Sequence, residues 1–334
     1  PDGSRILYAT WHDQNQGDVR IRDVRSGRET RISQVRAQYL APTWSPDGKQ
    51  VAWLRGSGAP LRGHDLPNEL WMRLEIAASS GQGEIRDVMS RGGAWGRTDR
   101  MAFSADSNRL LLVEQEGSEA PNSASKTILK SIDLNGQDAR IIARWTRATE
   151  VAISPSGKRV AWVEEHRVHS AGIPPVGNIT LELGPETEPV PVTNHGEMSG
   201  NWLAWSGQSE EKLSWALGPE LTFDDQVVSL QAKVPRAQGK GMVAYTNARV
   251  LTMGEAGVLE NATVVVQHDR IRSVGFDSPP VGATVIDATG KTLMPGLIDV
   301  HAHMHFGGDT QPQRSWRHEA NLAYGVTSVH DPSA

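Results

Sequence analysis

One turn sequence recurs through the first two-thirds of the chain and constrains the fold more than any other feature. Its clearest copy is Trp-Ser-Pro-Asp-Gly at residues 44–48, followed by a basic residue and a short apolar run. The third positions of the turns, residues 2, 47, 106, 156 and 208, lie 45 to 59 residues apart. Strand-like repeats with a period of about 40–50 residues are typical of β-propeller blades.

Each copy has the composition of a β-hairpin. Proline presets the backbone for the turn, and the Asp-Gly pair tolerates the positive φ that follows. Further turn pairs, such as Ser26-Gly27 and Asn135-Gly136, lie between the copies, so the sequence predicts four strands per repeat. The chain opens on Pro1-Asp2-Gly3, the end of such a turn, which predicts that the natural N-terminus lies further upstream.

The repeats over residues 1–234 resemble those of the TolB family, whose signature is an aromatic residue followed by Ser-Pro-Asp-Gly. The resemblance implies a mainly β fold with a β-propeller that is incomplete at its N-terminus. It also implies an exported protein, periplasmic or secreted, with a propeller surface that can make protein or oligomer contacts. We expect the eleven tryptophans to pack between blades rather than to stack on ligands.

Composition excludes several classes of partner and chemistry. The net charge of −5, from 34 basic and 39 acidic residues, predicts neither a nucleic acid nor an anionic membrane as partner. The chain has no cysteine, which excludes disulfides and thiolate chemistry. No apolar run approaches the roughly 18 residues that a membrane-spanning helix needs. A small-molecule substrate remains the expected partner.

The character of the sequence changes after residue 234. Residues 235–241 combine Gly, charge and no apolar period, as linkers do. Residues 242–296 predict a small β subdomain, with a hairpin that turns at His268-Asp269. Residues 297–303 then predict a single apolar strand that ends in His-Ala-His.

The two histidines of this last strand are the best candidates for metal ligands. Side chains two residues apart share one face of a strand, which places His301 and His303 about 6–7 Å apart. Two imidazoles at that spacing can bind one divalent ion. The apolar residues before them predict a buried parallel strand, and barrel enzymes keep their active sites at the C-terminal ends of such strands.

Five short motifs of this region occur in the order found in the metal-dependent amidohydrolase superfamily. They are Asn-Ala-Arg-Val at 247–250, Asp-Arg-Ile at 269–271, Asp-Ala-Thr-Gly-Lys at 287–291, Pro-Gly-Leu-Ile-Asp at 295–299 and His-Ala-His at 301–303. Residues 242–334 therefore resemble this superfamily, close to its imidazolonepropionase-like and prolidase-like branches. The resemblance implies that residues 297–334 begin a truncated (β/α)8 barrel.

The resemblance also implies an activity. The complete enzyme would hydrolyse carbon–nitrogen bonds of small amides or peptides with water activated by one or two divalent metal ions, zinc being the expected one. The remaining ligands and the catalytic Asp would follow Ala334, so no catalytic residue is assigned within this chain. We predict that this piece of the enzyme is inactive by itself.

Other polar residues near the histidine pair have weaker assignments. His305 has the same parity as His301 and His303 but lies beyond the strand. A second strand at 326–329 ends in His330 and Asp331, which are both expected to line the cleft. We predict substrate-binding roles for His305 and His330. Asp299 is expected to be structural or to support a ligand.

Two other functions are alternatives to the amidohydrolase activity. The first is a propeller-based protein-binding module with a non-catalytic C-terminal part. The second is a serine peptidase with a propeller lid, which needs a Gly-x-Ser-x-Gly turn after the propeller. The sequence after residue 234 contains no such turn, which disfavours the peptidase.

Overall fold

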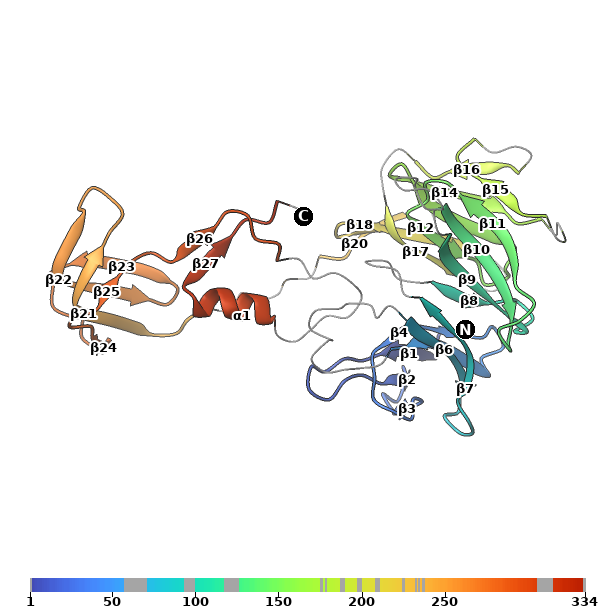
Figure 1. The fold of residues 1–334 in the computed structure, drawn as a ribbon, viewed down its shortest axis with the longest axis horizontal. Coiled ribbons are helices and arrows are strands. Elements are labelled where there is room, and N and C mark those ends of the chain that lie inside the picture. Colours follow the sequence, from blue (N-terminus) through green and yellow to red (C-terminus); the bar gives the residue numbers. More distant parts are fainter. Residues whose placement is uncertain are drawn as a thin grey trace. The chain divides into compact units, whose positions relative to one another are not determined.

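The computed structural model describes the chain as a mainly β protein (Figure 1). The described residues are 2–56, 71–92, 100–116, 126–174, 177, 179–186, 190–196, 200–207, 211–223, 226–231, 233, 235, 238–304 and 315–332. Contacts divide the chain into two compact units, which are treated separately below. The first comprises Pro1–Gln231 with Phe306–Ser315, and the second Ala232–His305 with Trp316–Ala334.

The first unit is a succession of mainly antiparallel sheets. The opening sheet has three strands, β1 (Arg5–Ala9), β2 (Val19–Asp23) and β3 (Glu29–Arg31). The next has four, β4 (Tyr39–Trp44), β5 (Gln50–Arg55), β6 (Trp71–Ala78) and β7 (Arg86–Gly92). The third is built on β8 (Met101–Phe103), β9 (Arg109–Glu116), β10 (Lys126–Asp133) and β11 (Arg140–Trp145).

Two further four-stranded sheets complete this unit. One contains β12 (Glu150–Ile153), β13 (Arg159–Glu164), β14 (Arg167–Gly172) and β16 (Val192–Asn194). The other contains β17 (Asn201–Ser206), β18 (Lys212–Leu217), β19 (Glu220–Phe223) and β20 (Gln226–Ser229). The intervening β15 (Leu181–Leu183) leaves this order and adds to the third sheet, parallel to β11. Its Leu183 packs there in the same core cluster as Leu129 and Trp145.

The recurring turn works through the hydroxyl of its serine. Ser45 donates from its Oγ to Asp47 Oδ1 over 2.6 Å and accepts the Gln50 amide at 2.9 Å. Gly48 closes the turn with a φ of +70°. The second copy repeats these bonds, and the Ser104 hydroxyl lowers the pKa of Asp106, as Ser45 does for Asp47. The motif is thus a local hydrogen-bonded device, which is why it can be recognised in sequence.

Apolar side chains fill the spaces between successive sheets. Trp53 packs with Val19 of the sheet before it and stands edge-on to Tyr39, with ring centroids 6.3 Å apart. Trp145 and Trp162 belong to neighbouring sheets and share one core cluster, with centroids 6.1 Å apart. These three tryptophans are fully buried, as expected for packing between repeats.

One histidine lies inside this core. His169 is 3% exposed, stacks on Trp162 with ring centroids 5.5 Å apart, and has no hydrogen-bond partner for either ring nitrogen in the described part of the chain. Desolvation penalises the charged ring and lowers the pKa of His169 below its ordinary value of 6.5. Burial therefore disfavours the protonated form of this histidine in the folded protein.

We expect His169 to make the first unit less stable in acid. Its folded pKa lies below its unfolded pKa, so the unfolded chain binds the proton first and stability falls as the pH drops below 6.5. His169→Phe should weaken that pH dependence, measured as the urea midpoint against pH. His166→Asn is the matched control, because His166 is an exposed histidine with a φ of +64° on the same hairpin. Equal pH dependence in the wild type and His169→Phe would contradict the prediction.

The second unit begins with a mixed sheet in the order β23–β22–β21–β24. Its strands are β21 (Met242–Leu251), β22 (Val258–Gln267), β23 (Arg270–Gly275), β24 (Thr284–Asp287) and β25 (Thr292–Leu293), the last pairing in parallel with β21. The hairpin turns at His268-Asp269, the predicted place, with a φ of +56° at His268. Residues 236 and 237 of the predicted linker lie outside the described residues.

Two of the sequence motifs meet in this sheet. Asp287 accepts hydrogen bonds from the hydroxyl and amide of Thr289 and from Asn247 Nδ2, at 2.6, 3.1 and 3.0 Å. These donors, the Thr289 hydroxyl first, lower the pKa of Asp287. Asn247 has a φ of +57°, a conformation that Asn tolerates better than most residues. The Asn-Ala-Arg and Asp-Ala-Thr-Gly motifs thus have a structural role in joining β21 to the turn after β24.

Candidate metal centre

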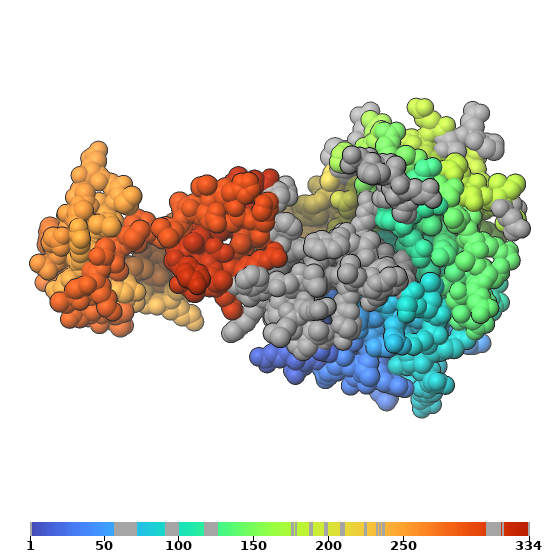
Figure 2. All heavy atoms as spheres, in the orientation of Figure 1, coloured from blue at the N-terminus to red at the C-terminus, as the bar shows by residue number. Residues whose placement is uncertain are grey.

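The second unit continues into one β–α–β segment, which carries the predicted histidines. Strands β26 (Leu297–Asp299) and β27 (Val326–Val329) are parallel, and helix α1 (Trp316–Ala323) precedes β27 along the chain. In the space-filling view, the orange and red atoms of these elements form one continuous block (Figure 2). Within the described residues this is a single β–α–β segment, so the predicted barrel stays a prediction.

The first strand of this segment is shorter than predicted, and the prediction that it is buried is wrong for this chain, because Leu297 and Ile298 are 50% and 67% exposed. It ends at Asp299, whose carboxylate accepts the amide of His301 at 3.0 Å and turns the backbone. Main-chain bonding to the second strand resumes beyond this bend. The amide of His330 donates to the carbonyl of Asp299 at 2.8 Å, and the amide of Ala302 donates to the carbonyl of His330 at 3.0 Å. The histidines therefore flank Ala302, whose amide is hydrogen-bonded to His330 of the neighbouring chain segment.

The rings of His301 and His303 lie beside each other. Their centroids are 5.2 Å apart and their planes meet at 74°. Ala302 between them is buried, whereas both histidines are exposed. A divalent ion binds neutral imidazole nitrogens at about 2.0–2.1 Å, and two adjacent, accessible rings fit part of such a site. No group of three potential metal ligands occurs among the described residues, so a ligand role for the pair stays a prediction.

The two predicted substrate-binding histidines have different outcomes. His305 lies outside the described residues. His330 has an exposed side chain whose Nδ1 is 3.3 Å from the carbonyl oxygen of Val300, and its main chain ties the two segments together. A substrate-binding role for either residue stays a prediction.

Asp331, which with His330 was predicted to line the cleft, lies beside the histidine pair. Its Oδ1 lies 3.9 Å from Nδ1 of His303, and its Oδ2 accepts the Met304 amide at 2.9 Å. The signal behind that prediction is positional. Asp331 follows the second of two adjacent parallel strands, whose C-terminal ends meet at one edge of a sheet.

The glycine of the Pro-Gly-Leu-Ile-Asp motif has a packing reason. A Cβ at Gly296 would lie 2.1 Å from Oγ1 and 2.7 Å from Cβ of Thr327. Such distances are far below van der Waals contact, so a side chain here would push β27 away from β26. Gly296 thus permits the close approach that brings Asp331 to the histidines.

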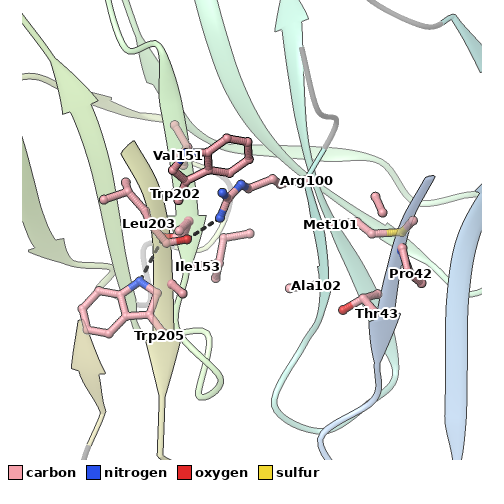
Figure 3. Close-up of a pocket in the computed structure, with 13 residues that line it drawn as sticks. Pro42, Thr43, Arg100, Met101, Ala102, Val151, Ile153, Trp202, Leu203 and Trp205 are labelled. Carbon is pink, nitrogen blue, oxygen red and sulfur yellow. Dashed lines mark hydrogen bonds between the residues drawn. The ribbon is translucent and has the colours of Figure 1, made fainter. Parts of the chain in front are cut away.

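The first unit contains a separate pocket of about 290 Å³. It is lined by residues of the first strands of four successive sheets, β4, β8, β12 and β17, together with Arg100 (Figure 3). Each of these strands is the outer edge of its own sheet in hydrogen-bonding order. The pocket is therefore built at the same position of four repeats.

A strained tryptophan stands at this pocket. Trp202 is 70% exposed and has a φ of +62°. It lies four residues before the turn serine of its repeat. Ala41 lies at the same position of an earlier repeat and has a φ of +47°. Glu150 fixes the strand by accepting the amides of Trp202 and Leu203 at 2.8 and 2.9 Å. Arg100 pairs with Glu150 and donates to the carbonyl of Leu203 (Figure 3). Trp202 departs from the expectation that the tryptophans pack between repeats.

Comparison with known proteins finds short sequence matches. The chain is 45% identical over 65 residues to an imidazolonepropionase from Mycolicibacterium smegmatis and 47% identical over 62 residues to a 5'-deoxyadenosine deaminase from Methanosarcina acetivorans. An imidazolonepropionase from Klebsiella pneumoniae is 33% identical over 94 residues. The matches cover 19%, 18% and 26% of this chain and 16%, 14% and 23% of those proteins. Part of the chain is thus related in sequence to hydrolases of the predicted kind.

The remaining comparisons concern family models and solved structures. No family model matches the chain. Among solved structures, TolB from Acinetobacter baumannii aligns with a TM-score of 0.41 at 13% identity, covering 84% of this chain and 65% of its own. The periplasmic gluconolactonase PpgL of Pseudomonas aeruginosa aligns with a TM-score of 0.43 at 15% identity, covering 80% and 82%. In the described part of the chain, no helix is both long and apolar enough to cross a membrane.

Proposed function

We propose that the complete protein is a metal-dependent hydrolase that cleaves carbon–nitrogen bonds of small amide-type substrates. The observation that carries this proposal is the pair of adjacent rings, His301 and His303, directly after the first strand of a parallel β–α–β segment. The short matches to an imidazolonepropionase and a deaminase support it. The chain spans less than a quarter of the length of these relatives, so activity is assigned to the complete protein and not to this chain.

In this proposal His301 and His303 hold a divalent ion, zinc being the expected one, through neutral imidazole nitrogens. Such an ion supplies Lewis-acid polarisation of a carbonyl and lowers the pKa of water. The chain's own residues supply the geometry. Asp299 fixes the His301 amide, and the Ala302–His330 main-chain bond fixes the backbone between the two rings. Ligands held in this way need little reorganisation when the ion binds.

The same proposal covers the organisation of the chain. Residues 1–234 would form part of a TolB-type propeller, 235–241 a linker, 242–296 the small β subdomain and 297–334 the start of a (β/α)8 barrel. The repeated four-stranded sheets support the first assignment, and the parallel β26–β27 pair supports the last. A periplasmic or secreted location and partner contacts through the propeller belong to this proposal as well.

Metal removal tests the proposed activity. The complete protein should hydrolyse members of a panel of N-acyl amino acids, dipeptides and cyclic amides. Dialysis against a chelator should abolish that activity, and Zn²⁺ added afterwards should restore it. Hydrolysis that persists after elemental analysis shows the protein to be metal-free would contradict the proposal.

A propeller-based binding module is the second candidate function. The strained, exposed Trp202 and its Arg100–Glu150 support favour it, because backbone strain of this kind gathers at functional sites. The same experiment separates the two candidates. A complete protein that binds no Zn²⁺ and hydrolyses none of the panel would favour the binding module.

A further inference from the structure

Asp331 is held beside the histidine pair from the neighbouring strand. The parallel register pairs Asp299 of β26 with Val329 of β27, and the His330–Asp299 and Ala302–His330 main-chain bonds extend that pairing past both strand ends. Asp331 therefore follows the point at which the two segments are joined. Its side chain is 16% exposed, against 56% for His303. The carboxylate is thus largely enclosed, whereas the ring beside it faces solvent.

The two oxygens of this carboxylate face different groups. Oδ2 accepts the Met304 amide at 2.9 Å, which fixes the carboxylate plane relative to the backbone that follows His303. Oδ1 then faces the ring, 3.9 Å from Nδ1 of His303. That separation is an ion-pair distance and longer than a hydrogen bond. Hydrogen bonds of active sites are often long before the site is complete and shorten when its ligand binds.

We propose that Asp331 is a positioning residue for His303. Its carboxylate selects the ring form that carries the proton on Nδ1, which leaves the lone pair of Nε2 for the metal. The inference rests on the proposed function, because it gives His303 the role of a ligand. Histidine ligands generally pass their second N–H to a carboxylate or a carbonyl, which fixes the tautomer and the orientation of the ring.

His301 provides the internal comparison. It lies next to Asp299, but that carboxylate accepts the backbone amide of His301 at 3.0 Å. Asp299 and Asp331 are thus two carboxylates at one site that each accept a backbone amide, of His301 and Met304 respectively. Only for Asp331 is a contact with a ligand ring also found in the described residues. This difference separates a residue that positions a ring from one that only supports the backbone.

The test reads the ring directly and needs neither metal nor activity. Nitrogen-15 NMR of histidine rings in the metal-free 334-residue chain should show His303 with its proton on Nδ1. Asp331→Ala should shift His303 toward the Nε2–H form that free histidine favours in water. Asp331→Asn keeps an oxygen for the Met304 amide while removing the charge, so the fold should persist and the shift should be partial.

Asp299→Asn is the matched control and should leave the tautomer of His303 unchanged. In the complete enzyme, Asp331→Ala should weaken Zn²⁺ binding by about 10- to 100-fold, measured by competition with a chromophoric chelator, and Asp331→Asn should rescue part of that loss. The proposal is overturned if His303 carries its proton on Nε2 in the wild type. It is equally overturned if Asp331→Ala leaves both the tautomer and the Zn²⁺ affinity unchanged.

A failure of the positioning role of Asp331 can be distinguished from a failure of the proposed metal-dependent function. If His303→Ala removes Zn²⁺ but Asp331→Ala changes neither tautomer nor affinity, the metal site stands and Asp331 only supports the backbone. If His303→Ala leaves Zn²⁺ bound, the histidine pair is not the metal site and the proposed function fails with it.

Discussion

Replacing His301 or His303 by Ala in the complete protein is expected to abolish metal binding and hydrolysis together. The two rings are adjacent and accessible, and main-chain bonds tie the backbone around them to His330, so each variant removes a side chain without disturbing that support. The loss of affinity should exceed the roughly 10- to 100-fold that outer-shell partners cost, because a direct ligand is lost. Elemental analysis of purified protein gives metal occupancy, and chelator competition gives affinity.

His318→Ala is the matched control for this experiment. His318 lies on α1, in the same β–α–β segment, and is also exposed, but it forms no group of three potential ligands with the ring pair in the described part of the chain. Its replacement should leave metal occupancy at the wild-type level. Urea unfolding of all three variants checks that the fold is retained. Full occupancy in His301→Ala or His303→Ala would remove the basis of the proposed metal site.

Local patterns account for the features that sequence predicted well. The Ser-Pro-Asp-Gly turns were recognisable because their hydrogen bonds join residues at most five positions apart, as between Ser45 and Gln50. The hairpin at His268-Asp269 and the parallel order of the last two strands followed from equally local signals. Each of these features is decided within one turn or one β–α–β segment.

Features that depend on distant residues were missed. The move of β15 to pair with β11 joins Ala143 to Leu181, and no short motif marks that pairing. The early end of β26 depends on one carboxylate, Asp299, that competes for the backbone of His301. Asp331 was placed at the cleft by its strand, but its proximity to the His303 ring depends on the pairing of two chain segments that no motif marks. Such choices are made by tertiary contacts that override local preference.

In the first unit, the environment of Trp202 likewise depends on residues that are distant in sequence. Its place before the turn serine is that of Ala41 in an earlier repeat, so the repeat predicts its backbone position. Its backbone is bonded to Glu150 of β12, and Arg100, which directly precedes β8, pairs with Glu150 and donates to the carbonyl of Leu203. A tryptophan in a repeat protein is therefore assigned to core or surface only when its neighbours from other repeats are known.

The second large expected effect is on the free energy of unfolding, which should depend on whether a replaced tryptophan is buried or exposed. Trp162→Ala should reduce the free energy of unfolding of the chain by about 3–5 kcal/mol, the range for a large aromatic side chain lost from a core. Trp162 is fully buried against Trp145 and His169, so its loss leaves a cavity between two sheets. Its Nε1 also donates to the buried carboxylate of Glu164 at 3.1 Å, which would lose that partner.

Trp202→Ala is the control of the same chemical size. Trp202 is 70% exposed, and alanine at its φ of +62° is strained much as tryptophan is, so the stability should change by no more than about 0.5 kcal/mol. Urea titration followed by far-ultraviolet circular dichroism measures both variants without relying on tryptophan fluorescence. A cost for Trp202→Ala equal to that for Trp162→Ala would mean that Trp202 is buried in solution. The pocket lined by the edge strands β4, β8, β12 and β17 would then be part of the core.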